Sequence, residues 1–195
     1  MGEFVLVLRS SPRPNGNSNV LADRLVAGAK EAGGRVKSLM LHEMDIRPCD
    51  ACDQCQETGV CILKDDMQKV YPLLEAADAI VMAGPVYWFT INAQAKLCID
   101  RWYALSLSDG KFHSKRIGII LTYGDSDLYT SGGINALHTF ESMFRYMGAE
   151  IAGMVYGTAD AIGDAQRQPE LMRRAHELGR TLGAARSSRP GREVG

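Results

Sequence analysis

The chain has 195 residues, of which 46% are hydrophobic and 23% are charged, and its 22 Lys and Arg residues nearly balance its 23 Asp and Glu residues. This length suits about one globular domain with a substantial core. A net charge of −1 argues against a global field that would attract nucleic acid or an anionic membrane. No apolar run approaches membrane-spanning length and the N-terminus has no signal-peptide pattern, so we expect a cytoplasmic protein with neither a nucleic-acid nor a membrane partner.

The first predicted elements are a buried strand, a polar loop and a helix. Residues 4–8 are an unbroken apolar run, typical of a parallel strand buried on both faces. The loop that follows is rich in Ser, Asn and Pro, and a helix begins near Asn17 or Ser18. A helix N-terminus directed at such a loop suits a phosphate, and Arg13 adds charge. The loop lacks the glycine spacing of a dinucleotide fingerprint and the GK[ST] of a P-loop, and an ordinary strand–helix turn is the alternative.

The rest of the chain alternates strands and helices. Strands are predicted at residues 36–41, 78–83, 116–122 and 151–156, and helices at 17–32, 65–77, 92–105, 134–147 and 169–185. The pattern predicts a doubly wound parallel α/β sheet, and five strands favour the flavodoxin-like order 2-1-3-4-5. Ligands would then meet the loops after the first, third and fourth strands. We expect one domain over residues 1–185, with a cysteine-rich insertion at about 45–64 and a disordered tail at 186–195.

Two further loops lie at the predicted ligand-binding edge. Tyr87, Trp88 and Phe89 follow the third strand, and such an apolar wall suits a flat ring system; alternatively, these aromatics cover the sheet edge or form a subunit contact. The loop that begins at Tyr123 and Gly124 could contact a ring edge, or its Gly132–Gly133 pair could simply allow the next helix to start. No Ser/His/Asp ordering indicates a catalytic triad, and the four histidines lie on separate elements.

Four cysteines follow the second strand with compact spacing, Cys49-x2-Cys52-x2-Cys55-x5-Cys61. In a reducing compartment such a group indicates metal or redox chemistry more often than disulfides. The successive two-residue gaps favour an iron–sulfur cluster, with zinc second and redox-active or unused thiols third. Cys98 is predicted to be a small core residue.

Three motifs together resemble a known family. SSPRPNGNSN resembles the GSPRxxGN[ST] phosphate loop of the NADPH-dependent FMN reductase group in the flavodoxin-like superfamily, and GPVYWFTINAQAKLCIDR resembles its GSPVYxxxxxAQxKxxIDR segment. PCDACDQCQETGVCILKDDM is similar to the cysteine motif of the iron–sulfur flavoprotein branch, whose members carry FMN and a [4Fe–4S] cluster. The likeness covers about residues 5–156, and Ser10 departs from it because the family has Gly there.

The resemblance implies a set of site residues. The FMN phosphate would be held by Ser10, Ser11, Arg13, Asn15, Asn17, Ser18 and Asn19. The flavin ring would be lined by Pro85, Val86, Tyr87 and Trp88, with Tyr123 and Gly124 opposite. The cluster would be ligated by Cys49, Cys52, Cys55 and Cys61. The family also implies a homodimer or homotetramer.

The resulting hypothesis is an FMN-dependent oxidoreductase that needs no catalytic side chain, because the flavin supplies the chemistry. Electrons would come from NAD(P)H or a reduced ferredoxin, and would pass to a small acceptor or, through the cluster, to a protein. One alternative is an iron–sulfur flavoprotein that only carries electrons. A second is a flavin-free interaction module that bears zinc or thiols.

Overall fold

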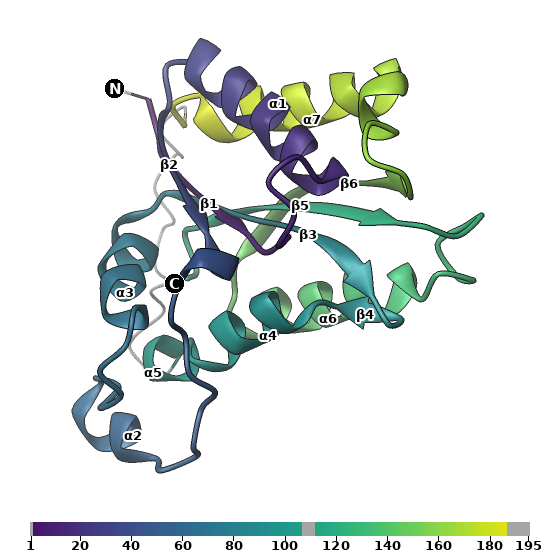
Figure 1. Cartoon of the computed structure of the whole chain (residues 1–195). Coiled ribbons are helices and arrows are strands. Elements are labelled where there is room, and N and C mark those ends of the chain that lie inside the picture. The colour runs from purple at the N-terminus through teal and green to yellow at the C-terminus, as the bar shows by residue number, and fades with distance from the viewer. Residues whose placement is uncertain (1, 107–111, 187–195) are drawn as a thin grey trace.

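Five parallel strands form the central sheet of the computed structural model, which describes residues 2–106 and 112–186 (Figure 1). The strands are β1 (Phe4–Arg9), β2 (Arg35–Met40), β3 (Ala79–Tyr87), β5 (Arg116–Tyr123) and β6 (Glu150–Thr158). They lie in the order β2-β1-β3-β5-β6, and every neighbouring pair is parallel. The predicted order 2-1-3-4-5 is therefore confirmed.

The apolar runs of the strands are explained by burial on both faces of the sheet. Along β1, Val5 and Val7 belong to one core cluster, whereas Leu6 and Leu8 belong to the other. All four are completely buried. Successive side chains of a strand point to opposite faces, so a strand covered on both sides has no polar positions to alternate with its apolar ones.

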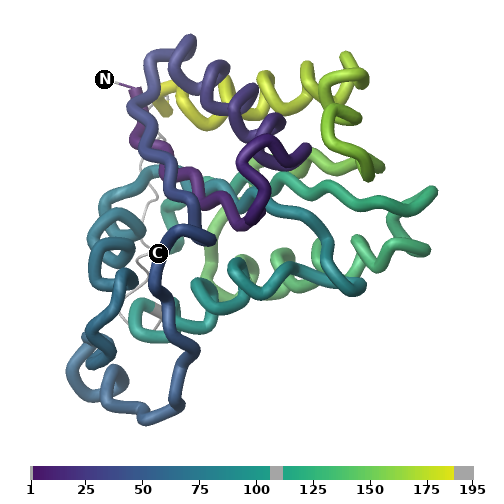
Figure 2. The backbone as a smooth tube through the Cα atoms, in the orientation of Figure 1, coloured from purple at the N-terminus to yellow at the C-terminus, as the bar shows by residue number. Residues whose placement is uncertain are grey.

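Helices cover both faces of the sheet (Figures 1 and 2). On one face, α1 (Asn17–Glu31) packs along α7 (Pro169–Gly183). The other face is covered by α3 (Met67–Ala76), α4 (Ala93–Asp100), α5 (Tyr103–Ser106) and α6 (Gly133–Tyr146). Two short 3-10 helices, η1 (Leu41–Glu43) and η2 (Ala165–Arg167), complete the connections.

The structure corrects the predicted third strand. It continues past Gly84 to Tyr87 and pairs antiparallel with a sixth strand, β4 (Thr90–Ile91), so Val86 lies opposite Ile91 and Tyr87 opposite Thr90. The aromatic segment is therefore a hairpin with Trp88 and Phe89 at its turn, rather than an irregular loop. The turn residues Trp88 and Phe89 include neither the Asn nor the Gly that usually mark a two-residue hairpin turn. The sequence pattern therefore contained no sign of the hairpin.

Two helical predictions also change. The single helix expected at 92–105 is interrupted between α4 and α5, where Arg101 and Trp102 are buried. The cysteine segment, expected as a loop, contains the short helix α2 (Gln54–Thr58) and projects beyond α3 and α5 in Figure 1. Residues 187–195, most of the tail expected to be disordered, lie outside the described residues. Within residues 2–106 and 112–186, no helix combines the length and apolar character needed to cross a membrane.

Candidate functional site

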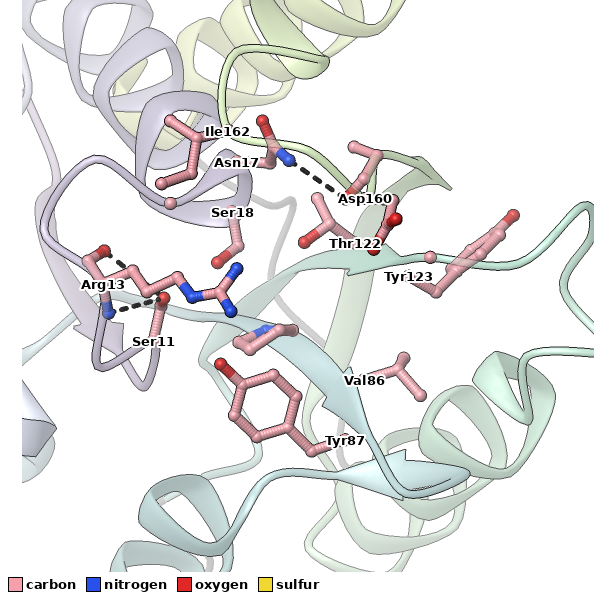
Figure 3. A pocket seen from close by; sticks show the side chains of 14 residues that line it. Ser11, Arg13, Asn17, Ser18, Val86, Tyr87, Thr122, Tyr123, Asp160 and Ile162 are labelled. Carbon is pink, nitrogen blue, oxygen red and sulfur yellow. Dashed lines mark hydrogen bonds between the residues drawn. The ribbon is translucent and has the colours of Figure 1, made fainter.

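An open cavity of about 220 Å³ lies at the carboxyl ends of β1, β3 and β5 (Figure 3). Four segments form its walls: the loop that leads into α1, the end of β3, the end of β5 and the loop after β6. The lining residues are Ser11, Arg13, Gly16, Asn17, Ser18, Pro85, Val86, Tyr87, Thr122, Tyr123, Gly124, Ala159, Asp160 and Ile162. This is the switch point at which doubly wound sheets bind ligands.

One end of the cavity is suited to an anion. The first hydrogen bond within α1 runs from the Val20 N–H to the Gly16 carbonyl at 3.0 Å, so the preceding N–H groups of the first turn have no acceptor inside the helix. The first turn of α1 carries no acidic residue. The guanidinium of Arg13 points into the cavity beside Ser11 and Ser18 (Figure 3). Free N–H groups, two hydroxyls and a cation are typical of a phosphate site.

Other residues predicted for the phosphate shape the loop instead. The Asn17 side chain lies at the cavity edge, but its Nδ2 donates to the carbonyls of Ala159 (3.0 Å) and Ala161 (2.9 Å), and its Oδ1 accepts from the Ala165 N–H at 3.1 Å. Asn19 is completely buried and donates to the Arg13 carbonyl at 2.8 Å.

Three of the seven predicted phosphate residues do not line the cavity: Ser10, Asn15 and Asn19. Ser10 is buried, and both its N–H and its hydroxyl donate to the Ala83 carbonyl, at 2.8 and 3.3 Å. Asn15 is exposed. Ser11, Arg13 and Ser18 are therefore the predicted residues with side chains at the anion end of the cavity, where the Ser11 hydroxyl also donates to the Arg13 carbonyl at 3.4 Å and accepts the Arg13 N–H at 3.2 Å.

The opposite wall is apolar and aromatic. Pro85, Val86 and Tyr87 line it. In Figure 3 the Tyr87 ring lies on the same side of the cavity as Val86, whereas the Tyr123 ring points away from Tyr87. Burial raises the pKa of the Tyr123 hydroxyl above its ordinary value. Trp88 does not line the cavity; its side chain lies at the hairpin turn and is 91% exposed. The ring-facing position predicted for Trp88 is therefore not observed.

The loop after β6, which was not predicted to be part of the site, contributes Ala159, Asp160 and Ile162 to the cavity. Its backbone is held by Asp164, whose Oδ2 accepts from the N–H groups of Asp160 (3.0 Å) and Ala161 (2.8 Å). Asp160 approaches Gly124 so closely that a Cβ there would lie 2.8 Å from Asp160 Oδ1. The available signal was position alone, because this loop follows a strand of the same parallel sheet.

The four cysteines of the insertion are not gathered into a metal site. Cys49 and Cys52 are exposed, Cys55 and Cys61 are half-buried, and none forms a disulfide. Across residues 2–106 and 112–186, no group of three or more His, Cys, Asp or Glu side chains is arranged to hold a metal ion. Positive φ angles at Ala51 and Asp53 (both 55°) turn the backbone between these cysteines. The predicted ligand set is therefore present as donors, but its assembled geometry is not confirmed.

Cys61 contacts a buried cation. Arg101 donates from Nη2 to the Cys61 sulfur at 3.2 Å, and its Nη1 lies 2.5 Å from Asp65 Oδ2, with both charged side chains fully buried. Burial alone would raise the pKa of the Cys61 thiol, but the Leu63 N–H and the Arg101 guanidinium hold it below its usual value. Burial likewise opposes ionisation of Asp65, yet Arg101 and two backbone N–H groups keep the pKa of its carboxyl low.

The cavity as a whole fits a flavin mononucleotide. Its anion-binding end matches a terminal phosphate, and its apolar wall, with backbone polar groups at the strand ends, suits a ring. Fold and site thus define a doubly wound α/β protein with a mononucleotide-type site at its switch point. The sequence matches the flavodoxin-like fold family over residues 4–182. The chain belongs to that family, in the NADPH-dependent FMN reductase group and its iron–sulfur flavoprotein branch.

Curated relatives include members of both groups. An iron–sulfur flavoprotein of Methanosarcina thermophila is 31% identical over 148 residues, 76% of this chain and 73% of that protein. The match to the iron–sulfur flavoprotein MJ1083 of Methanocaldococcus jannaschii, 32% identical, covers 50% of each chain, so this chain spans only half the length of that relative. YwqN of Bacillus subtilis, named as an NAD(P)H-dependent FMN-containing oxidoreductase, is 26% identical over 89% of this chain and 95% of its own.

Solved structures share the fold. An NAD(P)H:quinone oxidoreductase from Methanothermobacter marburgensis superposes with a TM-score of 0.77 at 18% identity, covering 97% of this chain and 100% of that one. An FMN-dependent NADH-azoreductase from Bacillus anthracis, in complex with FMN, gives a TM-score of 0.66 at 16% identity, covering 93% and 99%. At these identities the likeness concerns the fold.

Proposed function

We propose that this protein is an FMN-dependent oxidoreductase that takes electrons from NAD(P)H or a reduced ferredoxin and passes them to a small acceptor. The observation that carries the proposal is the single cavity in which the α1 N-terminus, Arg13, Tyr87 and Tyr123 meet. The names of the relatives, an NAD(P)H-dependent FMN-containing oxidoreductase among them, support the same chemistry. When bound, FMN supplies hydride and single-electron transfer.

The residues of the chain contribute binding and orientation. Ser11, Ser18 and Arg13 would bind the phosphate, and the N–H groups of the first turn of α1 would complete its hydrogen bonds. Pro85, Val86 and Tyr87 would hold one side of the ring, with Tyr123 and Gly124 opposite. We propose a cytoplasmic homodimer or homotetramer, in agreement with the expectation from the sequence.

The test is to identify the bound flavin and its electron donor. Protein purified without added flavin should release FMN on heat denaturation. Anaerobic stopped-flow mixing with NADH or NADPH should bleach the flavin absorption. If NAD(P)H reduces it negligibly while reduced ferredoxin reduces it rapidly, the protein is an electron carrier, the alternative that the cysteine-rich insertion favours. A protein that neither retains nor binds FMN would overturn both the oxidoreductase proposal and the electron-carrier alternative.

We also propose that the four cysteines of the insertion bind an iron–sulfur cluster. Four thiols within one short insertion are the donor set of a [4Fe–4S] cluster, and relatives are named iron–sulfur flavoproteins. Because the four thiols do not lie together in the structure, the insertion would have to close around the cluster. We assign no electron path through it. Anaerobically purified protein should contain about four iron and four sulfide per chain. Cys61→Ser should abolish this content, whereas the control Cys98→Ser, in the core, should retain it.

A further inference from the structure

A buried ion pair closes the base of the cysteine-rich segment, residues 47–65. Arg101 follows α4, and Asp65 ends the segment; their side chains are fully buried, with Nη1 and Oδ2 2.5 Å apart. Asp65 Oδ2 also accepts the N–H of Arg47, the first residue of the segment, at 3.1 Å. Its Oδ1 accepts the Met67 N–H at 3.1 Å, at the start of α3. One guanidinium–carboxylate pair therefore joins both ends of the segment to the core.

The guanidinium of Arg101 contacts the segment at two more points. Nη1 donates to the Arg47 carbonyl at 2.9 Å and Nη2 donates to the Cys61 sulfur at 3.2 Å. Arginine presents its N–H donors in a planar fork, whereas lysine is a compact point charge. The width of the guanidinium lets its two terminal nitrogens bond Asp65, Arg47 and Cys61 at once, a spread that the compact ammonium of lysine does not match.

The residue before α4, the helix that Arg101 follows, also contacts the predicted phosphate loop. Asn92, which precedes α4, donates to the Ser10 carbonyl at 2.6 Å. At the other end, the Tyr71 hydroxyl donates to the Arg101 carbonyl at 3.1 Å. The two ends of α4 are thus fixed to the loop that precedes α1 and to α3, while the Arg101 side chain that follows α4 contacts the cysteine segment.

A purely structural role would not require this arrangement. Buried ion pairs are often replaced by apolar residues without loss of stability. Such a replacement here would remove the bonds of Arg101 to Asp65, Arg47 and Cys61, and also the bond of Asp65 to the Arg47 N–H. We infer that Arg101 is a positioning residue, which fixes the cysteine segment and the Cys61 thiol in place relative to the flavin cavity. The inference holds whether the thiols ligate a cluster, bind another group or remain free, so it goes beyond the proposed function.

The test compares opening of the segment with global stability in three variants. Trypsin should cleave after Lys64, whose side chain is exposed, only when the base opens and releases the buried Asp65 that follows it. The bond after Arg47, the other basic residue of the segment, precedes Pro48 and resists cleavage. We expect at least tenfold faster nicking in Arg101→Gln, and tenfold faster hydrogen exchange of the Arg47 amide. Arg101→Lys keeps the charge beside Asp65, so its urea midpoint should recover toward wild type while nicking stays fast. The control, Lys96→Gln, removes an exposed ion pair with Asp100 on the same helix and should change neither rate.

If Arg101→Gln does not fold, the double variant R101Q/D65N removes both buried charges, and fast nicking in that folded protein supports the inference. Wild-type nicking in Arg101→Gln or in the double variant would overturn it. So would full recovery of protection in Arg101→Lys, because the ion pair alone would then hold the segment. All rates are measured on flavin-free protein, and the FMN dissociation constant is measured separately, so a failure of FMN binding is recognised independently.

Discussion

The amide of Asn17 connects the start of α1 to the loop after β6 through three hydrogen bonds, to Ala159, Ala161 and Ala165. Its motif position suggested a phosphate ligand, but an amide that already uses both hydrogens in the protein has none left for a phosphate. The backbone N–H of the same residue remains at the free end of the helix. Asn17 therefore builds the anion site without contacting the anion through its side chain.

Asn17→Ala is expected to lower the free energy of unfolding by roughly 2–4 kcal/mol, because three hydrogen bonds, two buried and one partly buried, are lost at about 0.5–1.5 kcal/mol each. Urea unfolding measures the loss. The affinities for FMN and for riboflavin should fall by equal factors, since the substitution does not remove the phosphate contact. The matched control Asn15→Ala, at an exposed position, should leave stability unchanged. A loss of FMN affinity without a loss of riboflavin affinity would contradict this role.

Arg13 is expected to act on the phosphate directly. Arg13→Gln removes the guanidinium that points into the cavity (Figure 3), and a hydrogen bond to a charged group contributes about 1.5 kcal/mol at an exposed site. The FMN dissociation constant should therefore rise roughly tenfold, while riboflavin, which has no phosphate, should bind as before. Flavin fluorescence quenching measures both constants. Arg24→Gln, at an exposed position of α1, is the control, and equal effects on the two flavins would contradict the assignment.

At the scale of elements, the β3–β4 hairpin has an unfavourable turn. Trp88 and Phe89 occupy both turn positions with φ angles of 48° and 69°, the left-handed region in which two-residue hairpins favour Asn and Gly. Large side chains are strained there by about 1–2 kcal/mol per residue. Both are also well exposed, at 91% and 53%, so neither gains much by burial.

The double variant W88N/F89G should therefore stabilise the protein by about 1 kcal/mol, because the relief of strain exceeds the entropy cost of one glycine. Its urea midpoint should rise. W88A/F89A removes the same rings but keeps side chains with a Cβ in the left-handed region, and should not stabilise. A lower midpoint for W88N/F89G would mean that the two rings, 5.9 Å apart edge to face, stabilise the turn more than its backbone strains it.

The interruption between α4 and α5 shows where sequence periodicity stops being informative. Residues 92–105 carry a continuous helical pattern, and nothing in it separates Arg101 from an exposed helix position. Arg101 is instead buried through its bonds to Arg47, Cys61 and Asp65. These partners lie 36 or more residues away in the sequence. A local pattern predicts which face of a helix is apolar, but it carries no information on a distant charge that draws a side chain inward.

For the whole molecule, the strand order and the ligand edge were predictable because they follow from strand count, burial and crossover handedness. Apolar runs such as residues 4–8 identified strands covered on both faces, and the polar loop before α1 identified the anion site. The loop after β6 and the open arrangement of the cysteines were not predictable. Asp160 reaches the cavity only because β6 lies beside β5, and the Cys61 thiol lies against Arg101, a residue 40 positions away in the sequence.

Because the cavity joins four segments spread from the loop before α1 to the loop after β6, its ligand should stabilise the molecule as a whole. A ligand that binds only the folded state adds about 2.7 kcal/mol at a concentration of 100 times its dissociation constant. For a chain of this size that raises the melting temperature by roughly 5–10 °C, as measured by calorimetry on flavin-free protein with added FMN. Riboflavin at the same concentration should give a smaller rise, and Arg13→Gln should reduce the FMN rise without affecting the riboflavin rise. Equal rises for the two flavins in the wild type would show that the α1 N-terminus holds no phosphate.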